Sequence, residues 1–296
     1  MSDRKESGIL ASARDDAQAA KARLETPQTR SPAYRLAFTD DEFLLREELR
    51  PVRLQLELLK PEMLLAARGV RNTIVIFGGA RIREPSVARE QAEKAESAAR
   101  GHPGDAELRR AAAVARRRAE SSRFYSEARE LARLVARNGG KGTPYDLTVV
   151  TGGGPGIMEA GNRGAHDEGA ESIGLNIVLP MEQAPNPYIT PELCFQFHYF
   201  AIRKMHFLMR AKALAAFPGG FGTLDELFEA LTLIQTGKVR PIPVLLFGKE
   251  YWSRVIDFDA LVEEGAISPK DIELFRYVET AREAWEIIAD SLQFEE

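Results

Sequence analysis

The run Pro218–Glu226, which reads Pro-Gly-Gly-Phe-Gly-Thr-Leu-Asp-Glu, lies between an apolar stretch and an amphipathic one. The apolar stretch, residues 213–217, is short and is followed by proline, as expected for a buried strand of a parallel sheet. The stretch after the turn, residues 224–235, carries apolar side chains at helical spacing. The run therefore predicts a strand, a glycine turn and the beginning of a helix.

The three glycines of this turn indicate a place where the backbone approaches a ligand. Glycine reaches positive φ without a Cβ penalty, and the free amides at the beginning of a helix favour a phosphate or another anion. A second interpretation is a capping box, because Thr223 and Glu226 have the Thr-x-x-Glu spacing. Three glycines in four positions are more than a cap requires.

Two further glycine clusters follow predicted strands. The strand 147–151 precedes Gly-Gly-Gly-Pro-Gly at 152–156 and a helix at 157–169, while the strand 73–77 precedes Gly78-Gly79. In open α/β sheets the ligand lies outside the carboxyl ends of the strands, where such turns converge. We therefore expect one nucleotide crevice formed by several turns.

The spacing of these glycines excludes two common nucleotide motifs. The fingerprint G-x-G-x-x-G would need glycine at the position of Ile157, and no Gly-Lys-Ser or Gly-Lys-Thr follows any of the turns. Binding of a dinucleotide for hydride transfer and hydrolysis of a nucleoside triphosphate are thus disfavoured. A mononucleotide or a sugar phosphate is the better hypothesis.

Three motifs in this order carry a family resemblance. The run 151–158, the pair Arg203-Lys204 and the run 218–226 resemble the Lonely Guy family of nucleoside 5′-monophosphate phosphoribohydrolases, and the resemblance covers about residues 72–265. It implies a Rossmann-like fold and hydrolysis of the N-glycosidic bond of AMP or of N6-modified, cytokinin-type ribotides to free base and ribose 5-phosphate. It also implies a homodimer or larger homo-oligomer, and no cofactor.

The resemblance makes Arg203 and Glu226 the catalytic pair, and the chemistry agrees. Cleavage of an N-glycosidic bond builds positive charge on the ribose, which a carboxylate stabilises, or the carboxylate activates the attacking water. A guanidinium offers planar donors to phosphate or ribose oxygens and stays charged at any working pH. Since Arg203 lies in a basic stretch, the alternative interpretation is a solvated helix face.

The remaining candidates surround this pair. Backbone amides of the turn and the hydroxyl of Thr223 would hold the phosphate. Thr232 could instead pack or bond its own backbone, and Glu182 could belong to a polar loop. The residues expected to bind substrate or its phosphate are Gly153, Gly154, Lys204, Gly219, Gly220, Gly222, Thr223, Asp225, Thr232 and Glu182.

Two other functions stay open. A binding module that senses a nucleotide or carries a molybdenum cofactor needs the glycine turns but not the carboxylate of Glu226. Members of this family have also been labelled lysine decarboxylases, an activity that requires a lysine forming a Schiff base with pyridoxal phosphate. No local feature singles out such a lysine, so we set this activity aside.

Composition limits the remaining possibilities. The chain has 296 residues, 44% of them hydrophobic and 28% charged, and a net charge of −4, which argues against a nucleic-acid partner. One cysteine forms no internal disulfide, and the four histidines show no metal-ligand spacing, so we expect a cytoplasmic protein without a metal. No apolar stretch is long enough to span a membrane, and we expect no membrane partner.

Strands alternate with helices from about residue 71 onward, which predicts an α/β fold with a Rossmann-like, doubly wound, mostly parallel sheet flanked by helices. We expect residues 1–30 to be a mobile tail and residues 31–70 a helical extension. The catalytic domain then spans 71–296, with a helical insertion at 83–122.

Overall fold

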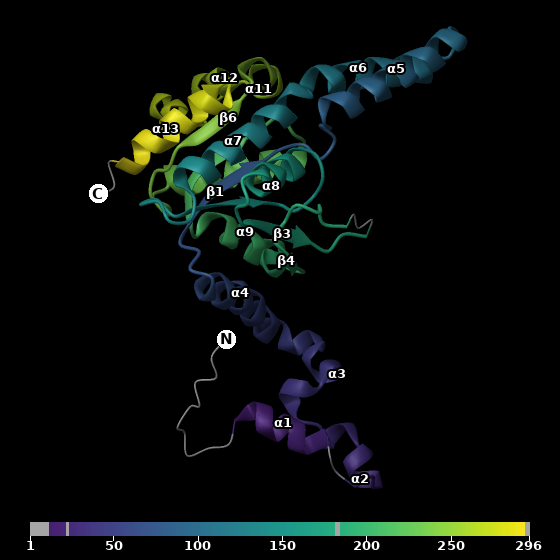
Figure 1. Cartoon of the computed structure of the whole chain (residues 1–296), viewed down its shortest axis with the longest axis vertical. Helices are drawn as coiled ribbons and strands as arrows, with labels where there is room; N and C mark the ends of the chain where they lie inside the picture. The colour runs from purple at the N-terminus through teal and green to yellow at the C-terminus, as the bar shows by residue number, and fades with distance from the viewer. Residues whose placement is uncertain (1–11, 22–23, 181–183, 294–296) are drawn as a thin grey trace. The chain divides into compact units, whose positions relative to one another are not determined.

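The computed structural model describes residues 12–21, 24–180 and 184–293 (Figure 1). Its internal contacts divide the chain into two compact units, Met1–Leu59 and Lys60–Glu296. In the described part of the chain, no helix combines the length and the apolar character needed to cross a bilayer.

The first unit is helical. It contains α1 (Ala13–Lys21), α2 (Pro27–Arg30), α3 (Asp41–Leu44) and the first turns of α4 (Arg50–Ala67), with short 3₁₀ turns between them. Thr26 and Thr29 form a capping box at the beginning of α2, and the Asp40 carboxylate accepts a hydrogen bond from the Phe43 amide at the beginning of α3. The predicted N-terminal helical extension is thus confirmed. Helices also lie inside the expected tail, and its mobility stays a prediction.

The second unit is built on a parallel sheet. The strand order is β4-β3-β2-β1-β5-β6-β7, and every neighbouring pair is parallel, as predicted. From the central β1 the chain adds strands on one side and then, beginning with β5, on the other, so the winding direction reverses between β1 and β5. The strands are β1 (Asn72–Phe77), β2 (Leu147–Thr151), β3 (Ser172–Ile177), β4 (Cys194–Phe197), β5 (Ala211–Ala216), β6 (Val244–Phe247) and β7 (Arg276–Val278).

Helices cover both faces of this sheet (Figure 1). The helices of this unit after α4 are α5 (Pro85–Gly101), α6 (Ala106–Ser121), α7 (Arg123–Gly139), α8 (Ile157–Asp167), α9 (Phe200–Leu208), α10 (Phe221–Gln235), α11 (Lys249–Val255), α12 (Phe258–Glu263) and α13 (Ala281–Gln293). They bury the apolar side chains of the strands from both sides, which explains why the strand sequences are nearly continuous apolar runs.

Strand β1 illustrates why the sheet has two hydrophobic cores. Ile74 and Ile76 belong to the core beneath α7, α8 and α13, while Val75 and Phe77 belong to the core beneath α9 and α10. Successive side chains of a strand point to opposite faces, so an uninterrupted apolar strand supplies both cores at once. Full burial of each such side chain contributes about 1.5–3 kcal/mol relative to its exposure.

The segment 83–122 contains α5 and α6, which run side by side (Figure 1). Alanines supply the buried positions of this pair: Ala88 and Ala92 on α5 and Ala112 on α6. The Asp105 carboxylate accepts hydrogen bonds from the amides of Glu107 and Leu108, which fixes the beginning of α6 after the Gly-rich break.

Close packing between α7 and α8 gives a first prediction. A Cβ on Gly164 of α8 would meet the Arg129 carbonyl oxygen and would lie 2.7 Å from the Ala132 Cβ on α7. We expect Gly164→Ala to lower the free energy of unfolding by about 2 kcal/mol, because the backbone contact cannot relax cheaply. Urea denaturation of the purified protein measures this difference.

The matched control is Gly101→Ala at the end of α5, where an added Cβ meets nothing within 4 Å. There, replacing glycine in a helix should leave the stability unchanged or raise it by up to about 1 kcal/mol. Equal effects of the two substitutions would contradict the packing argument.

Candidate functional site

Three glycine turns meet at the carboxyl edge of the sheet, next to the point where the winding reverses. The Gly79 amide after β1 donates to the Pro218 carbonyl after β5 (2.9 Å), and the Gly79 carbonyl accepts from the Ile157 amide at the beginning of α8 (3.3 Å). The structure thus brings together the turns that the sequence placed in one crevice, and it joins them through backbone hydrogen bonds.

The turn after β2 rests on a buried polar network. The Asn162 Oδ1 atom of α8 accepts from the Thr151 hydroxyl (2.7 Å) and from the Asn186 Nδ2 atom (2.9 Å), and Asn186 Nδ2 also donates to the carbonyls of Gly153 and Gly154, each at 3.1 Å. Because buried amides are costly without partners, this closed set of hydrogen bonds fixes the turn in one conformation.

The sequence motifs predict neither asparagine of this network. Asn162 is a poor helix former inside a helix, and it is fully buried. An asparagine inside a predicted helix is the sequence feature that points to such a network, although the sequence does not reveal its hydrogen-bond partners. Gly153 itself has φ 78°, a conformation that favours glycine, and an added Cβ would collide with the Asn176 side chain.

Arg203 is held beneath these turns and is not part of a solvated helix face. Its side chain, on α9, is 12% exposed, its Nε donates to the Leu175 carbonyl of β3 (2.7 Å), and its guanidinium lies 5.0 Å from the Phe207 ring centroid. A Cβ on Gly152 would lie 2.8 Å from the Arg203 Nη2 atom, so a larger residue at this position would force the guanidinium to shift. Burial lowers the pKa of Arg203, and the carboxylates of Glu226 and Asp225 oppose that shift.

Glu226 faces Arg203 from α10. Its side chain is 9% exposed, and its Oε1 atom lies 3.6 Å from the Arg203 Nη1 atom. Burial raises the pKa of Glu226 to about 7, although the positive charges of Arg203 and Lys204 oppose the shift. A carboxyl group that titrates near neutral pH is suited to proton transfer or to charge stabilisation.

The capping-box interpretation of this glutamate is wrong. Helix α10 begins at Phe221 with Gly220 as its N-cap and has no side-chain cap. Thr223 is therefore inside the first turn, and Glu226 lies one turn deeper and does not reach back to the helix end. The glycine turn continues directly into the helix, which leaves the glutamate side chain available to the site.

Lys204 joins the two helices of the site. Its Nζ atom lies 2.8 Å from an oxygen of Asp225 and 2.8 Å from an oxygen of Glu229, both on α10. Burial lowers the pKa of Lys204, but its hydrogen bonds to these two carboxylates outweigh that effect, so its pKa is raised. Lys204 and Asp225 thus form one charge cluster beside the Arg203–Glu226 pair.

The turn 219–223, called the phosphate turn after its predicted role, is exposed along much of its length. Gly220 and Gly222 are exposed, whereas Thr223 is buried and its amide donates to the Gly220 carbonyl (3.0 Å). The Tyr251 hydroxyl of α11 donates to the Gly219 carbonyl, which holds the turn from the side. The free amides at the beginning of α10 suit an anion.

Two of the predicted site residues, Thr232 and Glu182, are not part of the arrangement described so far. Thr232 is on the exposed side of α10, where it lines an open hollow of about 590 Å³ together with Lys204 and Asp225. Glu182 falls outside the described residues. The turn 219–223 leads directly into the helix that carries Glu226, and Gly153 and Gly154 follow Gly152, next to which the Arg203 guanidinium lies.

Comparison with known proteins identifies relatives of this chain. A family model described as "Possible lysine decarboxylase" matches residues 158–288. The chain is 34% identical over 154 residues to the cytokinin riboside 5′-monophosphate phosphoribohydrolase LOG3 of Arabidopsis thaliana, with 51% of this chain and 66% of the relative covered. It is 32% identical over 161 residues to the probable cytokinin riboside 5′-monophosphate phosphoribohydrolase LOGL3 of Oryza sativa subsp. japonica, with 51% of this chain and 68% of the relative covered.

The matches therefore span about two thirds of the length of these curated relatives. Among solved structures, the Moco carrier protein from Chlamydomonas reinhardtii aligns with a TM-score of 0.43 and 16% sequence identity, covering 75% of this chain and 98% of that chain.

The buried carboxyl group gives a prediction about stability. Since the folded-state pKa of Glu226 is about 7, above its ordinary value of 4.5, the folded protein binds this proton more tightly than the unfolded chain. The contribution of Glu226 to the free energy of unfolding is therefore fully present below about pH 4.5 and is lost as the pH rises through about 7. We expect the stability of Glu226→Gln, measured relative to wild type by urea denaturation, to increase from about pH 5 to about pH 8.

Glu263→Gln, which replaces an exposed carboxylate on α12, is the control and should show no such trend. A flat difference between Glu226→Gln and wild type over this pH range would contradict the raised pKa.

Proposed function

The chain belongs to the Lonely Guy (LOG) family, and we propose that it hydrolyses the N-glycosidic bond of nucleoside 5′-monophosphates to free base and ribose 5-phosphate. The observation that carries this proposal is the buried Arg203–Glu226 pair beside the glycine turns. The relatives named as cytokinin riboside 5′-monophosphate phosphoribohydrolases support the substrate class, which we propose to be AMP, its N6-modified cytokinin ribotides, or both.

The substrate phosphate binds at the turn 219–223, where exposed backbone and the beginning of α10 offer amide donors. The α10 macrodipole also favours a negative charge at this end. A phosphate bound there places the ribose toward the first turns of the same helix, which carry Glu226. Selectivity for monophosphates over nucleosides follows, because binding energy from the phosphate positions the reacting carbon.

Glu226 acts on the anomeric carbon in its ionised form. As the bond between C1′ and the base nitrogen breaks, its electron pair leaves with the base, and the carboxylate stabilises the cationic ribose or takes a proton from the attacking water. The water oxygen bonds to C1′, and the departing base receives a proton. Burial strengthens the electrostatic effect of the carboxylate because little water screens it.

Arg203 favours the ionised form of the Glu226 carboxylate. An isolated buried glutamate would be neutral up to high pH, whereas a guanidinium 3.6 Å away favours its ionised form. The hydrogen bond from Arg203 Nε to the Leu175 carbonyl orients the guanidinium and leaves its outer nitrogens directed toward the site. These nitrogens are available to ribose or phosphate oxygens.

We expect the purified protein to release free base from nucleoside monophosphates and not from the unphosphorylated nucleosides. Glu226→Gln and Arg203→Ala should each lower kcat/KM by about 100-fold or more, because each removes a charge that the transition state needs. Chromatographic measurement of the released base tests both statements.

Glu263→Gln is the matched control, since it neutralises an exposed carboxylate far along the chain from the site, and it should keep wild-type activity. Tight binding of monophosphates by the wild type without any base release would refute the hydrolase and would favour a nucleotide sensor or a carrier.

We further propose a cytoplasmic homo-oligomer in which a second copy covers the open hollow along α10. Phe221, directly after the phosphate turn, is 92% exposed, and it lines this hollow with Leu224 and Phe228. A large apolar side chain beside a substrate site is typical of a surface that becomes buried on association.

Multi-angle light scattering should give a mass of at least two chains for the wild type, and Phe221→Glu should shift the protein toward the monomer. Val114→Glu, at an exposed apolar position on α6, should leave the mass unchanged. A monomeric wild type at micromolar concentration would exclude this assembly.

A further inference from the structure

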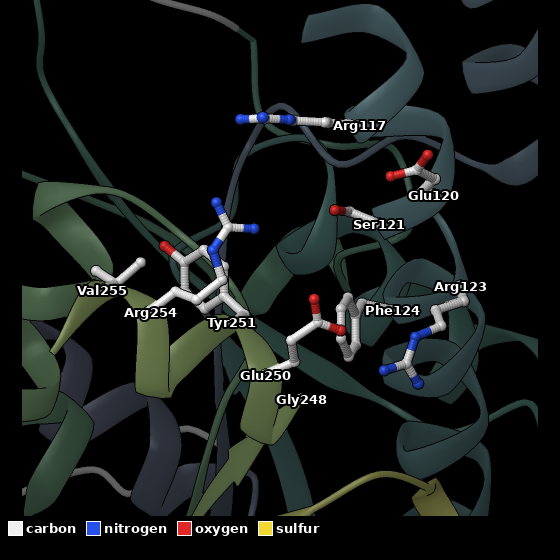
Figure 2. A pocket seen from close by; sticks show the side chains of 10 residues that line it. All are labelled: Arg117, Glu120, Ser121, Arg123, Phe124, Gly248, Glu250, Tyr251, Arg254 and Val255. Atoms are coloured by element: carbon white, nitrogen blue, oxygen red, sulfur yellow. The ribbon is translucent and has the colours of Figure 1, made fainter. Parts of the chain in front are cut away.

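A second pocket lies between the end of α6, the beginning of α7 and helix α11 (Figure 2). Its volume is about 420 Å³, within the range of small-molecule sites. Neither Arg203 nor Glu226 lines it, so it is distinct from the proposed catalytic site. Its lining includes charged and aromatic side chains: Arg117, Glu120, Phe124, Glu250, Tyr251 and Arg254.

Two guanidinium groups extend into this pocket without a carboxylate partner. Figure 2 shows Arg117 reaching in from α6 and Arg254 from α11. Within residues 12–21, 24–180 and 184–293, neither of these arginines forms an ion pair. Arg123, at the rim, differs because its Nη2 atom lies 2.8 Å from a Glu279 oxygen. Two guanidiniums that form no ion pair among the described residues suit a phosphate, which accepts their planar donors in pairs.

The rest of the lining suits a planar group with hydrogen-bond donors. Phe124 and Tyr251 supply aromatic surface from opposite sides of the pocket, and the carboxylates of Glu120 and Glu250 supply acceptors (Figure 2). The pocket therefore combines positively charged guanidiniums with carboxylate acceptors on separate side chains. A ligand that carries both an anion and ring amino or hydroxyl groups matches this set of side chains.

Tyr251 makes this pocket adjacent to the phosphate turn. Its ring lines the pocket, while its hydroxyl donates to the Gly219 carbonyl. Its neighbour Trp252 is fully buried and donates to the Phe247 carbonyl of β6 (2.9 Å), so the backbone that carries Tyr251 is anchored to the sheet. The pocket wall is therefore a fixed part of the fold and is shared with the turn 219–223.

We infer that this pocket is a second binding site, which takes a phosphorylated ligand of nucleoside monophosphate size with its phosphate between Arg117 and Arg254. Arg117 belongs to the segment 83–122, so α6 contributes a ligand-binding side chain to the catalytic unit. This site does not depend on hydrolysis at Glu226, and it stands or falls separately from the proposed reaction.

The test uses AMP as the probe and the full chain with Glu226→Gln, so that the probe stays intact. Isothermal titration calorimetry should give two sites per chain. Arg117→Ala with Arg254→Ala should remove one site or weaken it by at least about tenfold, since both guanidiniums are lost. Arg203→Ala should weaken the other site and leave this one in place.

The matched control is Arg116→Ala with Arg118→Ala, which removes the same charge from neighbouring exposed positions of α6 outside the pocket lining. It should bind AMP like the parent chain, and adenosine, which lacks the phosphate, should bind the pocket at least about tenfold more weakly.

Two results would overturn the inference: unchanged AMP binding in the Arg117/Arg254 variant, or an equal loss in the control, which would indicate a general charge effect. A parent chain that shows only the site lost in the Arg117/Arg254 variant would instead count against the proposed catalytic site and leave the second site standing.

Discussion

The burial of Glu226 next to Arg203 is the interaction on which the candidate site depends. Removing two charges from water is expensive, and a pair at 3.6 Å recovers that cost only if the remaining donors and acceptors are satisfied. The fold supplies the Leu175 carbonyl and the Phe207 ring for the guanidinium and brings Lys204 near the carboxylate. The balance leaves the pKa of Glu226 at about 7, so the same buried carboxyl group that weakens folding is the one on which the proposed reaction depends.

The glycine turns form the backbone part of the candidate site, beside the Arg203–Glu226 pair. They let three strand ends approach closely enough to hydrogen-bond to one another, and they leave room for the Arg203 guanidinium against Gly152. The turn after β2 also needs the buried amides of Asn162 and Asn186, because its carbonyls point inward, away from solvent. Rigid turns above a buried ion pair form a preorganised site, which lowers the reorganisation required during a reaction.

The helical segment 83–122 adds a pocket to the sheet and its flanking helices. Helix α6 ends beside α11, so Arg117 and Arg254, which are distant in sequence, line one pocket (Figure 2). Tyr251 links that pocket to the phosphate turn through its hydroxyl. The proposed second site thus uses the same edge of the sheet as the proposed reaction, where the ends of β5 and β6 are neighbours.

The sequence by itself determined the family, the parallel sheet and the glycine turns, because buried parallel strands are continuous apolar runs and turns of this kind require glycine at fixed positions. It also predicted Arg203 and Glu226 as the catalytic pair, through the resemblance and the chemistry of their side chains. Only the tertiary structure decided that Glu226 is not a helix cap, that Arg203 is buried, and that Asn162 and Asn186 support the turn after β2. Burial, pKa and hydrogen-bond partners depend on residues far apart in the chain, and a local pattern carries no record of which of them meet.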